Sequence, residues 1–168
     1  MLSEKLRVAS GVSQLDNLLG GLYIGDNVIW YDNSGSLASV YCLNFIQASQ
    51  VQNRPIIYVS FDRSPKNLLE KLGVLAQNNQ LIILDCFTYG KGSGSKVFLN
   101  FYEHKKSRWP CQIIRVDEPR QINQVMEALY GIHGTLAGEV RFVFESLTGM
   151  QELWGGEQHL INFYSHSC

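Results

Sequence analysis

The sequence predicts an α/β fold in which helices cover both faces of a mostly parallel sheet. Short, nearly continuous apolar runs alternate with helical stretches along the chain, and such runs are typical of parallel strands that are buried on both faces. The length of 168 residues fits one domain with a sizeable core. We therefore expect a single domain over residues 1–168.

The first half of the chain contains two of the expected strands. Residues 27–31 read Asn-Val-Ile-Trp-Tyr and predict the first strand, and residues 55–61 predict the second. Between them, residues 37–50 carry apolar side chains at helical spacing. After the second strand, Ser64 and Pro65 predict an N-cap and the first residue of a helix.

The second half continues the alternation. Residues 81–84, 112–116 and 140–144 are mostly apolar and predict three further strands. The pattern places one helix over residues 117–130 and a last one over residues 157–164. Five strands and their intervening helices complete the predicted layered fold.

The charge balance excludes several classes of partner. Fourteen basic and fifteen acidic residues give a formal net charge of -1, and no basic surface with interleaved aromatic residues is evident, so we expect no nucleic-acid binding. The N-terminus is polar and lacks the apolar core of a signal peptide. No apolar run approaches the ~20 residues of a membrane helix. We expect a cytoplasmic protein that does not bind membranes.

The cysteines give no metal or redox motif. Cys42, Cys86, Cys111 and Cys168 contain no C-x-x-C pair, and the first three lie among apolar residues, which predicts buried thiols. His159, His166 and Cys168 could contribute to a metal site near the end of the chain. A terminal cluster lacks the rigid frame that such a site needs, so we expect no metal there.

The turn after the first predicted strand has the arrangement of a phosphate-binding loop. A strand, a glycine-bearing turn and a helix direct backbone N–H groups and a helix N-terminus toward one point. A working loop of this type reads G-x-x-x-x-G-K-[ST]. The corresponding residues here are Asp32, Asn33, Ser34, Gly35, Ser36, Leu37, Ala38 and Ser39.

Three segments resemble the KaiC-type RecA domains, a family of ATPases. Residues 10–26 resemble the family's opening, a T/S-G-hydrophobic-x-x-L/F-D block followed by G-G-L-P-x-G. Residues 61–65 resemble the end of its second strand, and residues 143–148 resemble its Walker B strand. The similarity extends from about residue 10 to residue 166 and implies a RecA-like fold, with ATP and Mg²⁺ as the ligands of the family.

Within the phosphate loop, the departures from the family pattern outnumber the matches. Ala38 replaces the lysine that neutralises the phosphates, and Leu37 replaces the glycine before it. Asp32 replaces the first glycine, and a carboxylate ~4 Å from a phosphate charge would cost ~4 kcal/mol at an effective dielectric constant of ~20. Only Ser39 keeps its expected role, the hydroxyl ligand of magnesium.

The expected catalytic acids also differ from the family pattern. Asp62 and Arg63 stand where the family often has two adjacent glutamates, and Glu145 stands where Walker B normally ends in aspartate. These residues follow parallel strands, so they either line the crevice where ligands usually bind or are solvated edge residues. We regard Asp62, Arg63 and Glu145 as vestigial catalytic positions, and Ser39 and Glu145 as vestigial metal positions that hold no metal.

The residues of the loop also have a structural interpretation, which we favour. Asp32, Asn33 and Gly35 are turn formers, and Ser36 is a natural N-cap. On this interpretation no cofactor is bound, and the alternative is weak binding of ATP with Mg²⁺. A second glycine-rich stretch, residues 90–96, fails the Walker pattern, so we expect it to be a flexible, exposed loop.

The end of the chain suggests a role in association. Domains of the similar family continue with at least one more strand beside the first, whereas this sequence ends at Cys168. An open edge at Val28, Ile29 and Trp30 would favour contact with a protein partner or a homo-oligomer. We expect a non-catalytic RecA/KaiC-like module that regulates or scaffolds other proteins. The alternatives are an ATP sensor without hydrolysis and, less in keeping with the loop, an active ATPase.

Overall fold

The computed structural model describes residues 7–33, 37–103 and 109–167. Of residues 166 and 167 it describes the backbone only. The chain divides into two compact units, Met1–Arg54 and Pro55–Cys168. The expectation of a single domain stays a prediction. No helix among the described residues is long and apolar enough to cross a bilayer.

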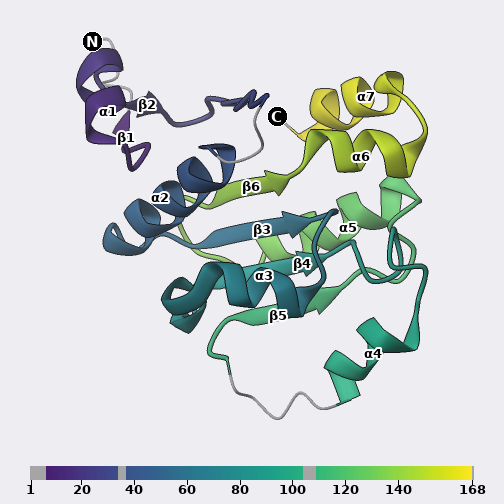
Figure 1. Ribbon diagram of the computed structural model, residues 1–168. Coiled ribbons are helices and arrows are strands. Elements are labelled where there is room, and N and C mark those ends of the chain that lie inside the picture. Colours follow the sequence, from purple (N-terminus) through teal and green to yellow (C-terminus); the bar gives the residue numbers. More distant parts are fainter. Residues whose placement is uncertain (1–6, 34–36, 104–108, 168) are drawn as a thin grey trace. The chain divides into compact units, whose positions relative to one another are not determined.

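The first unit consists of a small antiparallel pair and two helices (Figure 1). Strands β1 (Arg7–Val8) and β2 (Leu22–Tyr23) pair antiparallel, and α1 (Ser13–Leu19) connects them. Helix α2 (Leu37–Val51) matches the helix that the sequence predicts. Gly11 lies so close to α2 that an added Cβ would be 2.2 Å from the carbonyl oxygen of Asn44. Together with its positive φ of 86°, this contact requires glycine at that position.

The strand predicted at residues 27–31 is not formed. No other strand pairs with this segment in the described chain, and Val28, Ile29 and Tyr31 are exposed by 44%, 70% and 88%. The ring of Trp30 instead stacks on Tyr41 of α2 with ring centroids 3.9 Å apart. The prediction was wrong because β-propensity alone does not make a strand, which needs a neighbour to satisfy its N–H and C=O groups.

The second unit contains a parallel sheet of four strands in the order β5-β4-β3-β6. Its strands are β3 (Ile56–Ser60), β4 (Leu81–Asp85), β5 (Gln112–Arg115) and β6 (Arg141–Glu145). The sequence predicts all four within one or two residues. Ile57 pairs with Ile82 on one side and with Phe142 on the other, which fixes the register of the two central pairings.

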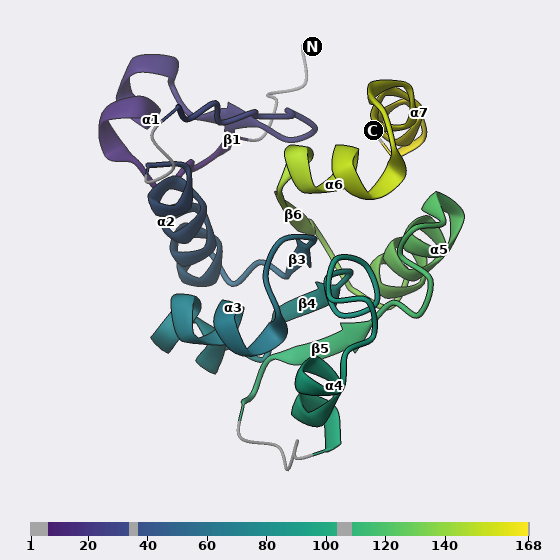
Figure 2. The same cartoon turned by 45° about the vertical axis from the view of Figure 1, so that its right-hand side comes forward.

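Helices cover both faces of this sheet, and Figure 2 shows α3 on one face and α5 on the other. The helices are α3 (Pro65–Leu72), α4 (Lys96–Glu103), α5 (Ile122–His133), α6 (Leu147–Trp154) and α7 (Glu157–Ser167), with a 3-10 turn at Gly73–Gln77. Alternate strand residues such as Ile57, Val59 and Leu84 form one core with side chains of α5, α6 and α7. The result is the layered α/β architecture that the sequence predicts, consistent with a RecA-like fold.

Several helix boundaries differ from the sequence prediction. Helices α4 and α6 are not among the predicted elements. Helix α5 begins at Ile122, five residues later than expected, because the segment around Pro119 forms a turn, with the N–H of Gln121 bonded to the carbonyl of Glu118 at 3.0 Å. The predicted start of α3 is confirmed, since the Ser64 hydroxyl accepts a hydrogen bond from the N–H of Asn67 at 3.4 Å.

Candidate functional site

The phosphate-loop region lies at the start of α2, where Asp32 has an unexpected role. One oxygen of the Asp32 carboxylate accepts hydrogen bonds from the backbone N–H groups of Leu37 at 2.7 Å and Ala38 at 3.1 Å. These are the first N–H groups of a 15-residue helix, which carry the positive end of its dipole. Asp32 therefore occupies the position at which such a helix binds an external anion.

This contact changes the interpretation of the loop. The sequence suggests Ser36 as the N-cap, but Ser34, Gly35 and Ser36 lie outside the described residues. Asn33 is exposed, and Leu37 is 57% exposed. Ala38 and Ser39 are half-buried in the first turn of α2. The structure thus places a built-in carboxylate on the amide groups, in agreement with a structural role for Asp32.

Glu145, at the end of β6, is the centre of a second cluster in the other unit. Its carboxylate accepts hydrogen bonds from the hydroxyl of Tyr58 at 2.5 Å, Nε of Arg63 at 2.9 Å and Nζ of Lys71 at 2.9 Å. The Glu145 side chain is only 14% exposed. It is therefore not a solvated edge residue, because three donors from β3, the following turn and α3 surround it.

The ionisation of Glu145 follows from these partners. Burial by itself raises the pKa of a carboxyl group, but the hydrogen bonds from Lys71, Tyr58 and Arg63 outweigh burial and lower the pKa of Glu145. The same contact raises the pKa of Arg63. Glu145 is consequently a carboxylate at neutral pH, with its charge neutralised by two cations of the same chain.

Asp62 lies two residues beyond the end of β3, in contact with the start of α6. Its carboxylate accepts a hydrogen bond from the hydroxyl of Ser146 at 2.5 Å and forms an ion pair with Lys91. Ser146 is also the N-cap of α6, because its side-chain oxygen accepts from the N–H of Gly149 at 3.0 Å. The peptide bond between Glu145 and Ser146 is cis.

Gly149 and Lys91 complete the surroundings of Asp62. A Cβ on Gly149 would lie 2.5 Å from the Asp62 carboxylate, so only glycine allows this approach. Lys91 also pairs with Glu152 of α6 at 2.5 Å. Burial favours loss of the Lys91 proton, but hydrogen bonds to the two carboxylates outweigh burial and raise the pKa of Lys91. Lys91 is therefore positively charged at neutral pH and forms an ion pair with the Asp62 carboxylate.

The loop that supplies Lys91 is not the exposed loop that the sequence suggests. Thr88, Gly90 and Gly92 are buried, although Ser93 and Ser95 are exposed. The loop is closed by backbone hydrogen bonds from Gly92 to Phe87 at 2.8 Å and from Gly94 to Thr88 at 2.9 Å. The prediction of exposure was wrong for the buried part because the glycines permit tight backbone packing rather than freedom.

Asp85, at the end of β4, anchors the start of the same loop. This fully buried carboxylate accepts from the N–H groups of Phe87 at 2.9 Å and Thr88 at 3.0 Å, and from the hydroxyl of Tyr102 at 2.5 Å. Burial, together with the neighbouring Asp85 charge, raises the pKa of Tyr102. The guanidinium group of Arg115 lies over the rings of Tyr89 and Tyr102, at 4.7 and 5.0 Å from their centroids.

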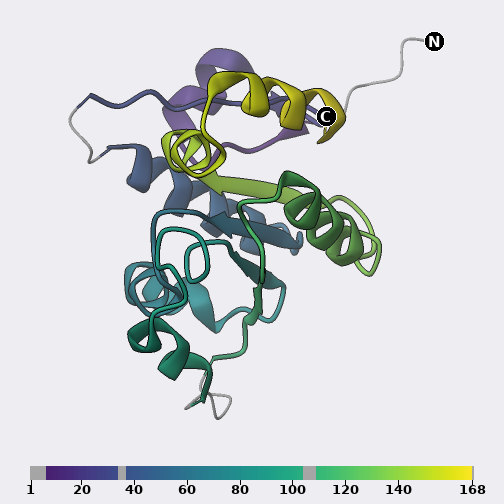
Figure 3. The same cartoon turned by 90° about the vertical axis from the view of Figure 1, so that its right-hand side faces the viewer.

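Asp62, Asp85 and Glu145 all lie at the carboxyl ends of parallel strands, the side of the sheet that Figure 3 turns toward the viewer. Ligands of open α/β sheets bind at this side. Here each of the three carboxylates already accepts from at least two donors of the chain itself. The arrangement resembles an active-site edge in position, and its polar groups are satisfied internally.

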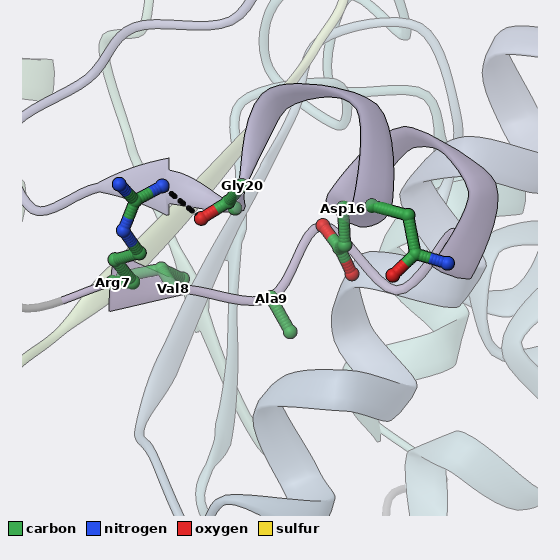
Figure 4. A pocket seen from close by; sticks show the side chains of 7 residues that line it. Arg7, Val8, Ala9, Asp16 and Gly20 are labelled. Atoms are coloured by element: carbon green, nitrogen blue, oxygen red, sulfur yellow. Dashed lines mark hydrogen bonds between the residues drawn. The ribbon is translucent and has the colours of Figure 1, made fainter.

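A separate open pocket of about 400 Å³ lies in the first unit (Figure 4). Arg7 donates to the carbonyl oxygen of Gly20 and to the hydroxyl of Tyr23, the latter at 3.0 Å. The Asp16 carboxylate accepts from the N–H of Ser10 at 2.8 Å. The bonds of Arg7 hold β1 to the C-cap of α1 and to β2, and the bond of Asp16 holds the middle of α1 to the segment after β1. The charged groups that line the pocket therefore stabilise the local structure.

No group of three metal-ligating side chains occurs among the residues that can be searched. His159 is exposed on α7, while the side chain of His166 and all of Cys168 lie outside the described part. Cys86 and Cys111 are buried as expected, whereas Cys42 is only half-buried. Burial raises the pKa of the Cys86 thiol, which makes it unreactive.

The sequence identified Asp62, Arg63 and Glu145, and the structure places all three at the same side of the sheet. The sequence did not identify the partners of these residues, which are Tyr58, Lys71, Lys91 and Ser146. Tyr58 had one available signal, a hydroxyl group between the apolar residues Ile57 and Val59 of β3. Lys91 had none, because its partner Asp62 is 29 positions away.

Comparison with known proteins finds a distant relative. The chain is 29% identical over 99 residues to the UPF0273 protein MJ1359 of Methanocaldococcus jannaschii, an alignment that covers 54% of this chain and 41% of the relative. The chain thus spans about two fifths of the length of that protein. No protein-family profile matches the sequence. The four-stranded parallel sheet with helices on both faces is consistent with a RecA-like fold.

Proposed function

We propose that this chain is a RecA/KaiC-like module without ATPase activity, which acts by associating with a protein partner or with copies of itself. One observation carries the proposal. The Asp32 carboxylate accepts from the Leu37 and Ala38 amides, which are the groups that a phosphate would need. A nucleotide would have to displace this internal anion without the help of a loop lysine.

The surroundings of Glu145 support the same conclusion. Magnesium at a Walker B acid needs carboxylate oxygens that are open to the ion. In this chain one oxygen of Glu145 receives both Arg63 and Lys71, and the other receives Tyr58. Two nearby cations repel a divalent ion, so we expect neither a stable Mg²⁺ site nor an activated water here.

The exposed apolar residues support association. In the first unit, Val28, Ile29 and Tyr31 are exposed on one short segment. A contiguous group of exposed apolar side chains is typical of a contact surface, whereas single exposed apolar residues are common on any protein. A regulator or scaffold that binds through such a surface needs no catalytic residues.

The test is a titration of the purified chain with ATP and Mg²⁺, followed by phosphate release and by thermal unfolding. We expect phosphate release no higher than in a matched Glu145→Ala variant, and no shift of the melting temperature at millimolar ATP, since weak ligands stabilise little. Turnover above that of the variant would contradict the proposal. A saturable shift without turnover would favour the second candidate, an ATP sensor, whose support is the retained α2 N-terminus with Ser39 in its first turn.

A further inference from the structure

The loop between β4 and α4, residues 86–95, consists of two halves that are fixed in different ways. The first half is fixed by close packing, since a Cβ on Gly90 would be 2.4 Å from the carbonyl oxygen of Cys86. In the second half, Ser93 is exposed and has a positive φ of 50°, which is uncommon for a residue with a side chain. The second half, residues 91–95, therefore depends on other contacts for its order.

Two backbone hydrogen bonds fold the second half back on the first. The N–H of Gly92 donates to the carbonyl oxygen of Phe87 at 2.8 Å. The N–H of Gly94 donates to the carbonyl oxygen of Thr88 at 2.9 Å. Both bonds lie within the loop, so they do not attach it to a neighbouring strand or helix, and a segment with few contacts outside itself opens readily.

Lys91 attaches the second half to the rest of the second unit. Its ammonium group forms ion pairs with the Asp62 carboxylate and with Glu152 of α6, the latter at 2.5 Å. In the described part of the chain, residues 91–95 make no other hydrogen bond or ion pair to Asp62 or to α6. One positive charge thus holds the loop to both, and all of these contacts lie within the second unit.

The ion pairs of Lys91 are more open to salt than the other cluster at this side of the sheet. The side chains of Lys91 and Glu152 are 30% and 60% exposed, whereas those of Lys71 and Glu145 are 16% and 14% exposed. Salt screens exposed ion pairs strongly and buried pairs much less. Of the two clusters, the one that holds the loop is therefore the one that should weaken as the ionic strength rises.

We propose that Lys91 is an ionic latch, which keeps residues 91–95 closed against Asp62 and α6 and releases them when its charge is screened or lost. Release leaves the Asp62 carboxylate with the hydroxyl of Ser146, which donates to it at 2.5 Å, and without its cation. These groups lie at the side of the sheet where ligands of α/β folds bind. The latch goes beyond the proposed function, because it concerns the loop and does not depend on whether a nucleotide binds.

The experiment is amide hydrogen exchange of the full chain, resolved to single residues, at ~0.05 M and ~0.5 M NaCl. The amides of Gly92 and Gly94 report on the second half of the loop, and those of β4 report on opening of the whole sheet. The variant is Lys91→Gln. Lys96→Gln is the matched control, because Lys96 is the next lysine along the chain, is exposed and forms no ion pair in the described part.

We expect exchange at Gly92 and Gly94 of the wild type to become about 5-fold faster at the higher salt concentration, since the screened pairs are worth a few fold in the opening equilibrium. Lys91→Gln should exchange at least that fast at low salt and should lose the salt dependence. Lys96→Gln should behave like the wild type. The amides of β4 should not change in any of these proteins.

Equal exchange in Lys91→Gln and the wild type would overturn the latch, and so would wild-type exchange that is independent of salt. If the amides of β4 also exchange faster in Lys91→Gln, the substitution has destabilised the whole sheet, and Glu152→Gln then decides. That variant removes one ion pair from an exposed side chain. Faster exchange of the loop alone in Glu152→Gln supports the latch, and unchanged exchange of the loop overturns it.

Discussion

Asp32 shows how one side chain can change the electrostatics of a loop. A carboxylate at the N-terminus of α2 satisfies two backbone donors, at 2.7 and 3.1 Å, and is favoured by the helix dipole. The same carboxylate repels a phosphate at the same place. The residue that the sequence suggests to be a turn former and an obstacle to phosphate is thus also the residue that completes the start of the helix.

Restoring the loop tests this dual role. We expect the triple variant Asp32→Gly, Leu37→Gly and Ala38→Lys to gain nucleotide affinity in a calorimetric titration, because the α2 amides become open to an anion. It should still release no phosphate, since Asp62 is held by Lys91 and Ser146. The control is the double variant that keeps Asp32, which should not bind. Binding by this control would show that Asp32 does not block the amides.

Glu145 gives a prediction about stability. Replacement by glutamine leaves the cations of Arg63 and Lys71 beside a neutral group, and loss of one partner from a largely buried ion pair costs about 3 kcal/mol of unfolding free energy. Urea unfolding of Glu145→Gln measures this cost. Glu70→Gln, at an exposed position of α3, is the matched control and should change stability by less than ~0.5 kcal/mol. Equal effects in the two variants would argue against the cluster.

The pH dependence of stability has a definite sign. Because the pKa of Glu145 is lowered in the folded chain from its ordinary value of 4.5, its contribution is complete above that value and is lost as the pH falls through the folded pKa. We expect the wild type to lose more unfolding free energy than Glu145→Gln on acidification from about pH 5.5 to pH 3. Urea titrations of both proteins at several pH values measure the difference. If the unfolding free energies of the two proteins change equally with pH, Glu145 is not stabilised by its neighbours.

At the scale of elements, the loop after β4 is where composition and structure differ most. Its glycines and serines are typical of a mobile linker, yet Gly90 and Gly92 are buried. The N–H groups of Phe87 and Thr88 hold the start of the loop on the Asp85 carboxylate. A Cβ on Gly90 would be 2.4 Å from the carbonyl oxygen of Cys86. The glycines are therefore required by close packing of the backbone.

Two glycine-to-alanine substitutions separate packing from flexibility. Gly90→Ala should destabilise the chain by about 2 kcal/mol or more, because backbone must move to admit the methyl group. Gly131→Ala, in the interior of α5 with no atom within 4 Å of the new Cβ, should stabilise it by about 0.5–1 kcal/mol through helix propensity. Thermal unfolding distinguishes the two signs. A neutral Gly90→Ala would mean that the loop is as adaptable as its composition suggests.

At the scale of the whole molecule, the two units differ in how much core they contain. Among the described residues of the first unit, the buried apolar side chains are Val8 and Ile46. The second unit has the large cluster around Ile57, Val59 and Leu84, closed by α5, α6 and α7. The stability of a small unit depends on the apolar area that it removes from water. We therefore expect the second unit to fold on its own and the first unit not to.

Separate expression of the units tests this difference. We expect residues 55–168 to unfold cooperatively with heat and to retain near-ultraviolet circular dichroism, because the sheet and its core are contained in this segment. Residues 1–54 should show no cooperative transition. A cooperative transition in the shorter fragment would mean that its exposed apolar residues are tolerated without a partner.

The sequence by itself determined the α/β class, the four strands of the parallel sheet and the cap at Ser64. Each of these depends on residues that are close together in the chain. Only the tertiary structure decided which groups meet: Lys91 with Asp62, Tyr58 and Lys71 with Glu145, and Asp32 with the α2 amides. It also decided that residues 27–31 form no strand. The physical reason is that hydrogen bonding and ion pairing depend on distance in space, and local propensity carries no information about the partner.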